Sequence, residues 1–279
     1  MDGYPNGHGK KIYSDKSCYE GNWEDGYKNG LGKLMYPNED YYEGNWKENL
    51  QNGFGKYVYS DGDIYEGNYE KGKISGQGKK IYANGNVYIG EWKDGLINGH
   101  GIKRYLNGNV FEGFWVEGKI NGFGKMFYSN GNIYEGHYIN EKRSGEGKMI
   151  YKNNEIYEGK WLDGLKSGTG KMVFVNGDVY KGDFKNGLPC GEGNMVYANG
   201  DVYEGGWNDT HPNGYGKKNY LNGDFYEGNW LDGFKNGEGR FLIKATGEYY
   251  EGNWKDSIKQ GYGKNTYANK DIYEGIIYL

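Results

Sequence analysis

Residues that could do acid–base chemistry recur along this chain at a fixed interval. A glutamate follows an aromatic residue in ten of twelve copies of one 23-residue pattern, as in Glu20, Glu43 and Glu66. Two carboxylates that face each other across a bound substrate can act as general acid and base. A catalytic pair is needed once, however, and this slot is repeated along the whole chain. We therefore interpret the glutamates as one side of structural cross-strand ion pairs.

The other candidates for catalysis or metal binding lack the necessary spacing. Four histidines have neither zinc-finger nor zincin spacing: His8, His100, His137 and His211. The recurrent Gly-x-Gly never continues into a dinucleotide or phosphate-loop motif. Asp61 and Asp63 lie in a predicted turn, with no glutamate at calcium-loop spacing. We predict that the chain is not an enzyme, with no catalytic residue, no bound metal and no cofactor.

The elements that position these residues follow a 23-residue repeat. Counted from an aromatic anchor as position 1, Gly is at positions 3, 12 and 14, and all eight tryptophans are at position 5. Position 18 is mostly aromatic, and Asn-Gly recurs at positions 20 and 21. The anchors are Tyr19, Tyr42, Tyr65, Tyr88, Phe111, Tyr134, Tyr157, Tyr180, Tyr203, Tyr226, Tyr250 and Tyr273. We predict one array over residues 1–279, with about eleven full repeats from Tyr19 and partial units at 1–18 and 273–279.

Each repeat reads as a β-hairpin because its pattern alternates with a period of two. Tyr-x-Gly-x-Trp forms one strand and Gly-x-x-x-Tyr the next. We predict that a six-residue loop, such as Lys93 to Asn98, joins the two strands of a repeat. A tight Asn-Gly turn then joins the second strand to the first strand of the next repeat. Short connections make all neighbouring strands antiparallel. The predicted fold is all-β: an elongated, twisted single-layer antiparallel meander of tandem 23-residue hairpins.

Two registers are compatible with the Asn-Gly turn. A three-residue turn at residues 152–154, with its last residue in the left-handed region, places Lys148 opposite Glu158 and Ile150 opposite Ile156. It also pairs Gly147 with Gly159 and Gly145 with Trp161. A two-residue turn would place Lys148 opposite Gly159. We favour the first register because it pairs opposite charges. We further expect the glycines to leave space for the Trp rings, and the extra residue within 241–249 to form a bulge or bend.

Composition excludes several classes of protein. The net charge is −4, with 34 basic and 38 acidic residues intermixed, whereas a nucleic-acid-binding surface usually has a basic stripe. We therefore predict no nucleic-acid partner. The first eleven residues have no apolar run, and no segment is apolar over ~18 residues, so neither a signal peptide nor a transmembrane helix is predicted. We expect a cytoplasmic protein that is neither secreted nor membrane-spanning, with Cys18 and Cys190 reduced.

The motif Tyr-Glu-Gly-x-Trp-x-x-Gly-x-x-x-Gly-x-Gly resembles the MORN (membrane occupation and recognition nexus) repeat. It occurs at residues 88–101 (with Ile89 for Glu) and 226–239, and the resemblance covers essentially the whole chain. It implies a protein-binding scaffold at the cytoskeleton, in cilia or at the cell cortex, associated with the inner face of a membrane. Position 8 departs from the motif, and we expect longer or more polar loops there, at Asn49, Glu141, Thr210 and Ser257.

A single-layer sheet leaves one aromatic face without a covering layer, so we predict that partner proteins bind there as an extended peptide or helix. The candidate residues are Tyr65, Tyr88, Trp92, Phe111, Trp115, Tyr134, Tyr157, Trp161, Tyr203 and Trp207. An uncapped last strand predicts self-association as a homodimer, through Tyr273, Ile276, Ile277 and Tyr278. The alternative is a phosphoinositide-binding or membrane-binding adaptor, which would use a lysine row at position 15: Lys10, Lys33, Lys56, Lys79, Lys125 and Lys148.

Overall fold

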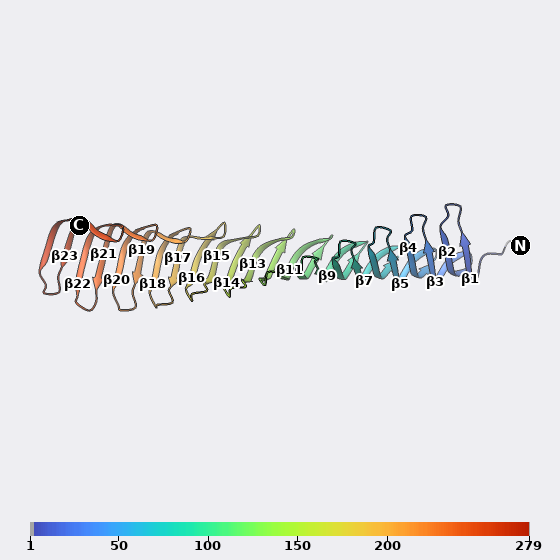
Figure 1. Ribbon diagram of the computed structural model, residues 1–279, viewed down its shortest axis with the longest axis horizontal. Helices are drawn as coiled ribbons and strands as arrows, with labels where there is room; N and C mark the ends of the chain where they lie inside the picture. Colours follow the sequence, from blue (N-terminus) through green and yellow to red (C-terminus); the bar gives the residue numbers. More distant parts are fainter. Residues whose placement is uncertain (1–2, 279) are drawn as a thin grey trace. The chain divides into compact units, whose positions relative to one another are not determined.

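The computed structural model describes residues 3–278, and it forms two compact units, Met1–Lys142 and Arg143–Leu279 (Figure 1). Met1, Asp2 and Leu279, which belong to the predicted partial units, lie outside the described residues. The described residues form strands and turns and contain no helix. The predicted all-β class is therefore confirmed.

The strands of the first unit follow one another along the chain. They are β1 Gly7–Ile12, β2 Cys18–Glu24, β3 Tyr27–Met35, β4 Tyr41–Lys47, β5 Leu50–Val58, β6 Ile64–Glu70, β7 Lys73–Ile81, β8 Val87–Lys93, β9 Leu96–Arg104, β10 Val110–Val116, β11 Lys119–Phe127 and β12 Ile133–Ile139.

The second unit repeats this arrangement. Its strands are β13 Lys142–Ile150, β14 Ile156–Leu162, β15 Leu165–Val173, β16 Val179–Lys185, β17 Leu188–Val196, β18 Val202–Asn208, β19 His211–Asn219, β20 Phe225–Leu231, β21 Phe234–Ile243, β22 Glu248–Lys255, β23 Ile258–Thr266 and β24 Ile272–Ile277. Within each unit every strand pairs antiparallel with the next one along the chain, which confirms the meander.

The favoured register is also confirmed. Strands β13 and β14 pair Lys148 with Glu158 and Ile150 with Ile156, as well as Gly147 with Gly159 and Gly145 with Trp161. The turn between them has three residues and ends at Asn154, whose φ is 70°. Asn and Gly tolerate this left-handed conformation better than other residues do.

Two predictions about the connections were wrong. The expected six-residue loop is a two-residue turn, Asp94-Gly95, between β8 and β9; both residues have positive φ, 51° and 87°. Such turns match the twist of a hairpin. The register of β8 and β9 shifts between Gly90 and Trp92, and the strands then stay paired up to the turn. The units lacking Gly at position 8 also turn in two residues, for example Glu48-Asn49, so their loops are not longer.

The extra residue in the last full repeats lengthens a turn and does not interrupt a strand. Phe241 pairs with Tyr250 and Ile243 pairs with Glu248 without a shift between β21 and β22. The expected bulge or bend within residues 241–249 is therefore absent, because the four residues 244–247 form the turn, with Gly247 donating its N–H to the carbonyl oxygen of Ile243.

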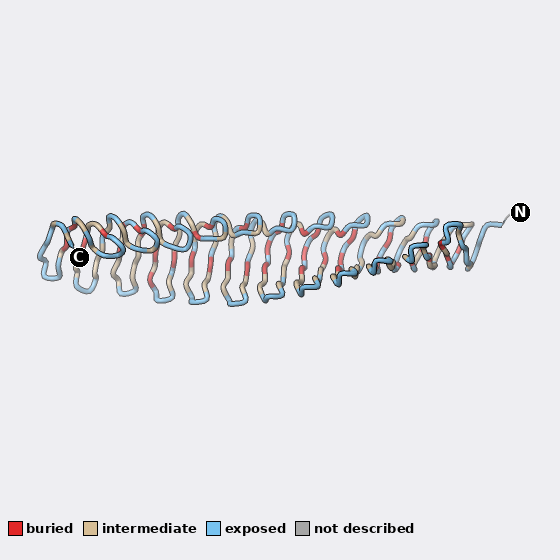
Figure 2. Tube along the Cα trace, turned by 45° about the horizontal axis from the view of Figure 1, so that its top comes forward, coloured by how far each residue is buried: buried red, intermediate tan, exposed pale blue. Residues whose placement is uncertain are grey.

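Side chains at position 22 connect successive Asn-Gly turns. An aspartate or asparagine oxygen at this position accepts the backbone N–H of position 19 in the next repeat, at 2.7–3.1 Å. Examples are Asp40, Asp63, Asn86, Asn109, Asp178, Asp201 and Asp224. Figure 2 shows that the turns are exposed, whereas buried residues lie in the middle of the strands.

Candidate functional site

The two sides of each sheet carry different side chains. We call the side with the anchors and tryptophans the ring face, and the side with the position-2 and position-15 residues the charged face. Strand β20 shows the alternation: Tyr226 and Trp230 are buried on the ring face, whereas Glu227 and Asn229, on the charged face, are not. Each face is a possible binding surface, because the described strands of each unit form no second layer over it.

On the ring face, anchor rings lie over glycines. Gly228 and Gly239 face each other across β20 and β21, and a Cβ atom on either would clash with the hydroxyl end of Tyr226. The Tyr226 hydroxyl donates a hydrogen bond to the carbonyl oxygen of Asn229 at 2.9 Å. We expected the Trp ring to use this space. The anchor fills it instead, because its ring lies along its own strand and reaches across both glycines.

The tryptophans join successive repeats. Trp230 packs edge-to-face against the anchor of its own repeat, Tyr226, with ring centroids 5.0 Å apart, and against Tyr203 of the preceding repeat at 5.3 Å. Edge-to-face pairs of this kind add stabilisation beyond the buried area. Within each unit the core is therefore a row of perpendicular rings, with one anchor and one position-5 ring from each repeat.

The ten aromatic residues predicted to bind partners belong to this buried row. Their exposed fractions are only 0–6%, so the expected exposure was wrong; they are Tyr65, Tyr88, Trp92, Phe111, Trp115, Tyr134, Tyr157, Trp161, Tyr203 and Trp207. Their rings cover one another and the glycines beneath, which removes them from solvent without a second layer. Their role in partner binding stays a prediction, and a partner would contact the side chains that lie above them.

Those side chains are half-buried lysines and position-18 tyrosines. In the second unit Lys235 lies opposite Trp230 in register, and its ammonium nitrogen is within 4.3–5.7 Å of four ring centroids. These rings belong to Tyr220, Tyr226, Phe241 and Trp254. The ammonium group of Lys218 lies 5.1 Å from the same Tyr220 ring. Cation–π contacts hold both lysines against the ring face.

Like charges gather around Lys235. Burial, followed by the positive charges of Lys218 and Lys259, lowers the pKa of Lys235 to about 8. Lys218 has a carboxylate partner, Asp201, at 3.3 Å, and Lys259 donates to the side-chain oxygen of Asn265 at 2.9 Å. Among the described residues, no carboxylate lies within ion-pair distance of Lys235.

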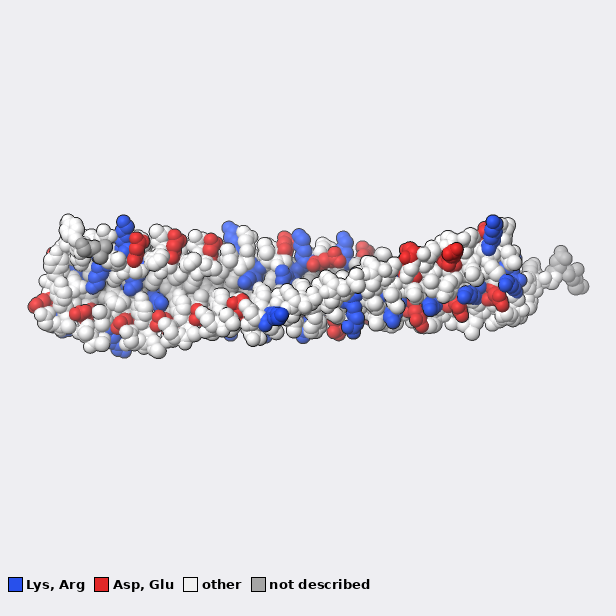
Figure 3. Space-filling model, in the orientation of Figure 1, with Lys and Arg blue, Asp and Glu red and all other residues white. Residues whose placement is uncertain are grey.

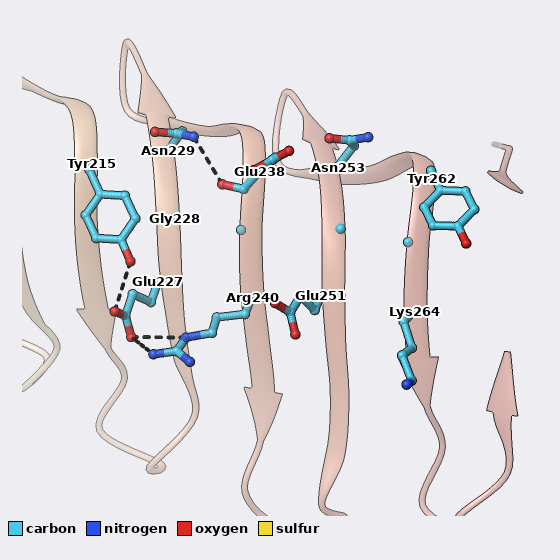
Figure 4. Close-up of a pocket in the computed structure, with 13 residues that line it drawn as sticks. Tyr215, Glu227, Gly228, Asn229, Glu238, Arg240, Glu251, Asn253, Tyr262 and Lys264 are labelled. Carbon is cyan, nitrogen blue, oxygen red and sulfur yellow. Dashed lines mark hydrogen bonds and ion pairs between the residues drawn. The ribbon is translucent and has the colours of Figure 1, made fainter. Parts of the chain in front are cut away.

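The charged face holds a shallow hollow of about 640 Å³ over β19–β23. Figure 4 shows Glu227 between Tyr215 and Arg240 near one end of the hollow, where it accepts hydrogen bonds from the Tyr215 hydroxyl at 3.0 Å and the Arg240 guanidinium at 2.8 Å. The hydrogen bond from Arg240 is the main reason that the pKa of Glu227 is lowered. These three groups satisfy one another, whereas the carboxylates of Glu238 and Glu251, which also line the hollow, have no ion pair among the described residues.

Most lysines of the position-15 row are also paired with carboxylates. Lysines of this row pair with position-2 glutamates of the next repeat at 3.0–3.9 Å: Lys10 with Glu20, Lys33 with Glu43, Lys125 with Glu135, Lys148 with Glu158 and Lys264 with Glu274. Lys56 and Lys79, which also belong to the predicted row, have no carboxylate within ion-pair distance among the described residues. Most of the row therefore presents paired charges, which argues against its use as a phosphoinositide site.

Sequence reasoning missed a set of exposed apolar residues on the charged face. They are Leu31, Phe54, Phe114, Phe123, Tyr215 and Tyr262, each at least 46% exposed. They occupy positions 4 and 13, which are next to the glycine positions along each strand. Because side chains alternate between the two sides of a sheet, these residues point away from the anchors. The period-two pattern that placed the anchors could have identified them.

The residues tested for chemistry are dispersed. His8 and His211 are exposed at separate strands, and His100 and His137 stack against Phe114 and Phe123 with centroids 5.5 and 5.4 Å apart. No group of three or more His, Cys, Asp or Glu side chains suited to a metal ion occurs within the described residues. Asp61 and Asp63 have structural roles in their turn, where Asp63 also pairs with Lys80 at 2.8 Å.

The residues predicted for self-association lie at strand β24. Tyr273, Ile276 and Tyr278 are exposed and Ile277 is half-buried. Within the described residues, β24 pairs with β23 alone, so its other edge has unpaired backbone groups. Dimerisation through this edge stays a prediction.

Fold and site together define an all-β hairpin-repeat protein with a buried aromatic row. The family model described as MORN repeat matches residues 1–18, 19–41, 42–64, 65–87, 88–110, 111–133, 134–156, 157–179, 180–202, 203–225, 226–243 and 250–272. The chain belongs to the MORN repeat family. Repeats of this family indicate a protein-interaction scaffold, and no curated protein matches the sequence.

Some solved structures share part of this architecture. The TCP domain of SAS-4 from Drosophila melanogaster, in complex with a proline-rich motif of Ana2, is 18% identical, with 57% of this chain and 89% of that chain covered and a TM-score of 0.37. The TCP10 domain of CPAP from Danio rerio, in complex with a STIL peptide, is 10% identical, with 97% and 99% covered and a TM-score of 0.38. TM-scores this low carry no argument about function. Among the described residues, no helix is long and apolar enough to cross a membrane.

Proposed function

We propose that this protein is a non-enzymatic scaffold that binds partner proteins along the ring face. One observation carries the proposal: the ring face is hollowed and has no covering layer. Figure 3 shows a hollow over the C-terminal strands of the second unit, with Lys and Arg side chains on its floor and Asp and Glu side chains on its two rims. On the charged face of these strands, basic side chains lie among glutamates, so a floor with basic side chains alone belongs to the ring face.

The shape of the partner follows from the repetition. Each repeat adds two strands, or roughly 10 Å, to the surface, and offers the same half-buried tyrosine and ring edges. A partner that is itself extended, as a strand-like peptide or a helix, contacts several repeats in succession. The buried anchors provide a rigid floor, while position-18 side chains such as Tyr197 and Tyr220 provide the contacts.

The cellular setting is part of the same proposal. We place the scaffold in the cytoplasm, where it links cytoskeletal, ciliary or cortical proteins and is held near the inner face of a membrane through them. Direct phosphoinositide binding is the weaker alternative, because most of the position-15 lysines are paired with glutamates. Imaging and fractionation of the tagged full chain test this placement; a partner set restricted to another compartment would contradict it.

Self-association through β24 is a separate element of the proposal. Exposed strand edges invite pairing with a second chain, and Ile276 is 52% exposed beside that edge. Light scattering of the full chain should show a concentration-dependent dimer that Ile276→Lys abolishes. A monomer at all concentrations, or a dimer that survives Ile276→Lys, would remove dimerisation from the proposal and leave partner binding intact.

The main test compares the two faces of the second unit. The full chain, the ring-face variant Tyr220→Ala and the charged-face variant Tyr215→Ala are tagged, cross-linked in cells and purified with their partners. We expect Tyr220→Ala to lose partners that Tyr215→Ala retains. Equal partner sets, with both variants folded by circular dichroism, would overturn the assignment to the ring face.

A further inference from the structure

We propose that Lys218, Lys235 and Lys259 form a carboxylate-binding site in the ring-face hollow of the second unit, and that its ligand is an extended acidic segment of a partner protein. This inference rests on the proposed scaffold function and adds the chemistry of the partner. It concerns lysines at positions 10 and 16 of the repeat, which lie on the opposite side of the sheet from the position-15 row.

The three lysines are placed on one face by the register of the sheet. Lys218 is opposite Tyr226, Lys235 is opposite Trp230, and Lys259 is opposite Trp254. They come from the alternate strands β19, β21 and β23. Lys235 and Lys259 occupy the same repeat position on alternate strands, roughly 10 Å apart. Lys218 begins four residues away along the strand direction, but its ammonium group and that of Lys235 reach the same Tyr220 ring, at 5.1 and 5.7 Å.

Lys235 is the centre of the site because its charge has no partner. Its ammonium group is surrounded by the rings of Tyr220, Phe241 and Trp254 at 4.3–5.7 Å. Among the described residues, the charged groups that lower its pKa are Lys218 and Lys259, both positive. A half-buried positive charge beside two others is unfavourable unless an anion joins it. An incoming carboxylate would remove this repulsion and accept hydrogen bonds from the ammonium group.

The acidic rims of the hollow favour a narrow peptide over a membrane. Figure 3 shows Asp and Glu side chains along both rims and basic side chains between them. A flat anionic bilayer would meet the rims first and be repelled. A single extended chain can lie between the rims with its carboxylates on the floor. In a polyproline II conformation the residues rise about 3.1 Å each and every third side chain lies on one side, so side chains three residues apart match the spacing of Lys235 and Lys259.

This geometry predicts a ligand with a defined spacing. Two carboxylates three residues apart, on one side of a polyproline II segment, would meet Lys235 and Lys259, and Lys218 would lie beside the carboxylate bound to Lys235. The aromatic residues beside each lysine would cover the intervening apolar parts of the peptide. Lys218 shares its charge with Asp201, so we expect Lys235 to contribute most to affinity.

The experiment uses the full chain and a fluorescein-labelled twelve-residue peptide with Glu at every third position. A second peptide carries Gln at those positions. Fluorescence anisotropy at physiological salt should show binding of the Glu peptide only. We expect Lys235→Gln to weaken binding roughly tenfold and Lys235→Arg to retain it, since the charge remains. Lys264→Gln, on the charged face, is the matched control and should change binding less than roughly twofold.

Several outcomes would overturn the inference. These are equal binding of the Glu and Gln peptides, no binding of either, or equal losses in Lys235→Gln and Lys264→Gln. Pelleting with phosphatidylserine vesicles that is lost in Lys235→Gln, without peptide binding, would assign the site to lipid instead. If Lys235→Gln is misfolded by circular dichroism, Lys259→Gln takes its place with the same expectation. A negative peptide result alongside partner loss in Tyr220→Ala would reject this site and leave the scaffold function standing.

Discussion

The indole nitrogen of Trp230 donates a hydrogen bond to the backbone carbonyl oxygen of Gly216, 3.1 Å away on the neighbouring strand. The same bond links tryptophan to a position-14 glycine in six other repeats, made by Trp23, Trp46, Trp92, Trp161, Trp207 and Trp254. Trp115 differs, because its buried indole N–H has no hydrogen-bond partner among the described residues. The chain therefore contains its own comparison between a bonded and an unbonded tryptophan.

We predict that Trp230→Phe destabilises the protein more than Trp115→Phe. Both changes remove similar apolar area, but only Trp230→Phe breaks a hydrogen bond and leaves the Gly216 carbonyl without its partner. The difference in free energy of unfolding should be about 1 kcal/mol. Urea unfolding followed by circular dichroism measures it. Equal losses in the two variants would show that the indole bond contributes nothing.

The glycines beneath the anchors should not tolerate a methyl group. In Gly239→Ala the new Cβ would overlap the Tyr226 ring, so we expect a loss of about 3 kcal/mol from overpacking. Gly9 occupies the same repeat position but has no anchor ring above it, and a Cβ there would meet only the Trp23 ring at an ordinary 3.6 Å. Gly9→Ala should therefore cost less than about 1 kcal/mol. Thermal unfolding of both variants tests this, and similar losses would contradict the role given to the anchor.

The repeat made the strand pairing predictable, because Lys148 and Glu158 recur as a charge pair in one register and not in the other. The two-residue turn at Asp94-Gly95 was missed because the bulge between Gly90 and Trp92 breaks the alternation on which loop length was judged. The position of the anchors over the glycines was missed, because two strands of glycine admit a ring that ordinary strands would exclude and the sequence does not show whether Tyr or Trp fills the space. The lysine site was missed because position 10 varies among repeats. Only the cross-strand pairing of Lys235 with Trp230 could have indicated that this lysine lies on the ring face.

Asp201 should link two turns mainly by accepting a hydrogen bond, and less by its ion pair with Lys218. Its side chain accepts the backbone N–H of Leu221 at 3.1 Å, and Asn86 makes the equivalent bond to Leu106 at 2.9 Å. We predict that Asp201→Ala costs about 1–2 kcal/mol, whereas Asp201→Asn costs less because it keeps the acceptor. Thermal unfolding at neutral pH distinguishes the two; an equally large loss in Asp201→Asn would assign the effect to the ion pair with Lys218.

The same carboxylate gives an acid-sensitive contribution to stability. Burial opposes ionisation of Asp201, but the Leu221 N–H, the Asn199 side chain and Lys218 outweigh it and lower its pKa. A lowered folded-state pKa adds stability that is present above the unfolded value of about 3.9 and is lost as pH falls through the folded value. Between neutral pH and pH 3, the wild type should lose more stability than Asp201→Asn. An identical acid response in the two proteins would exclude this contribution.

Lys235 should show the opposite dependence on pH. Its folded pKa is about 8, against an ordinary value of 10.5, so between these values the unfolded chain binds more protons than the folded chain. Stability of the wild type therefore rises with pH across this window, and the cost of keeping Lys235 charged is fully present below it.

We predict that Lys235→Met is more stable than the wild type at pH 7, and that this advantage shrinks towards pH 10. Urea unfolding of both proteins across this pH range measures the difference in their free energies of unfolding. The titration of other groups contributes equally to both proteins and cancels in that difference. Lys264→Met, on the charged face, controls for removal of a lysine as such. A constant advantage across the range, or a wild type more stable than Lys235→Met at pH 7, would show that the folded protein already neutralises this charge and would also remove the reason for an acidic ligand.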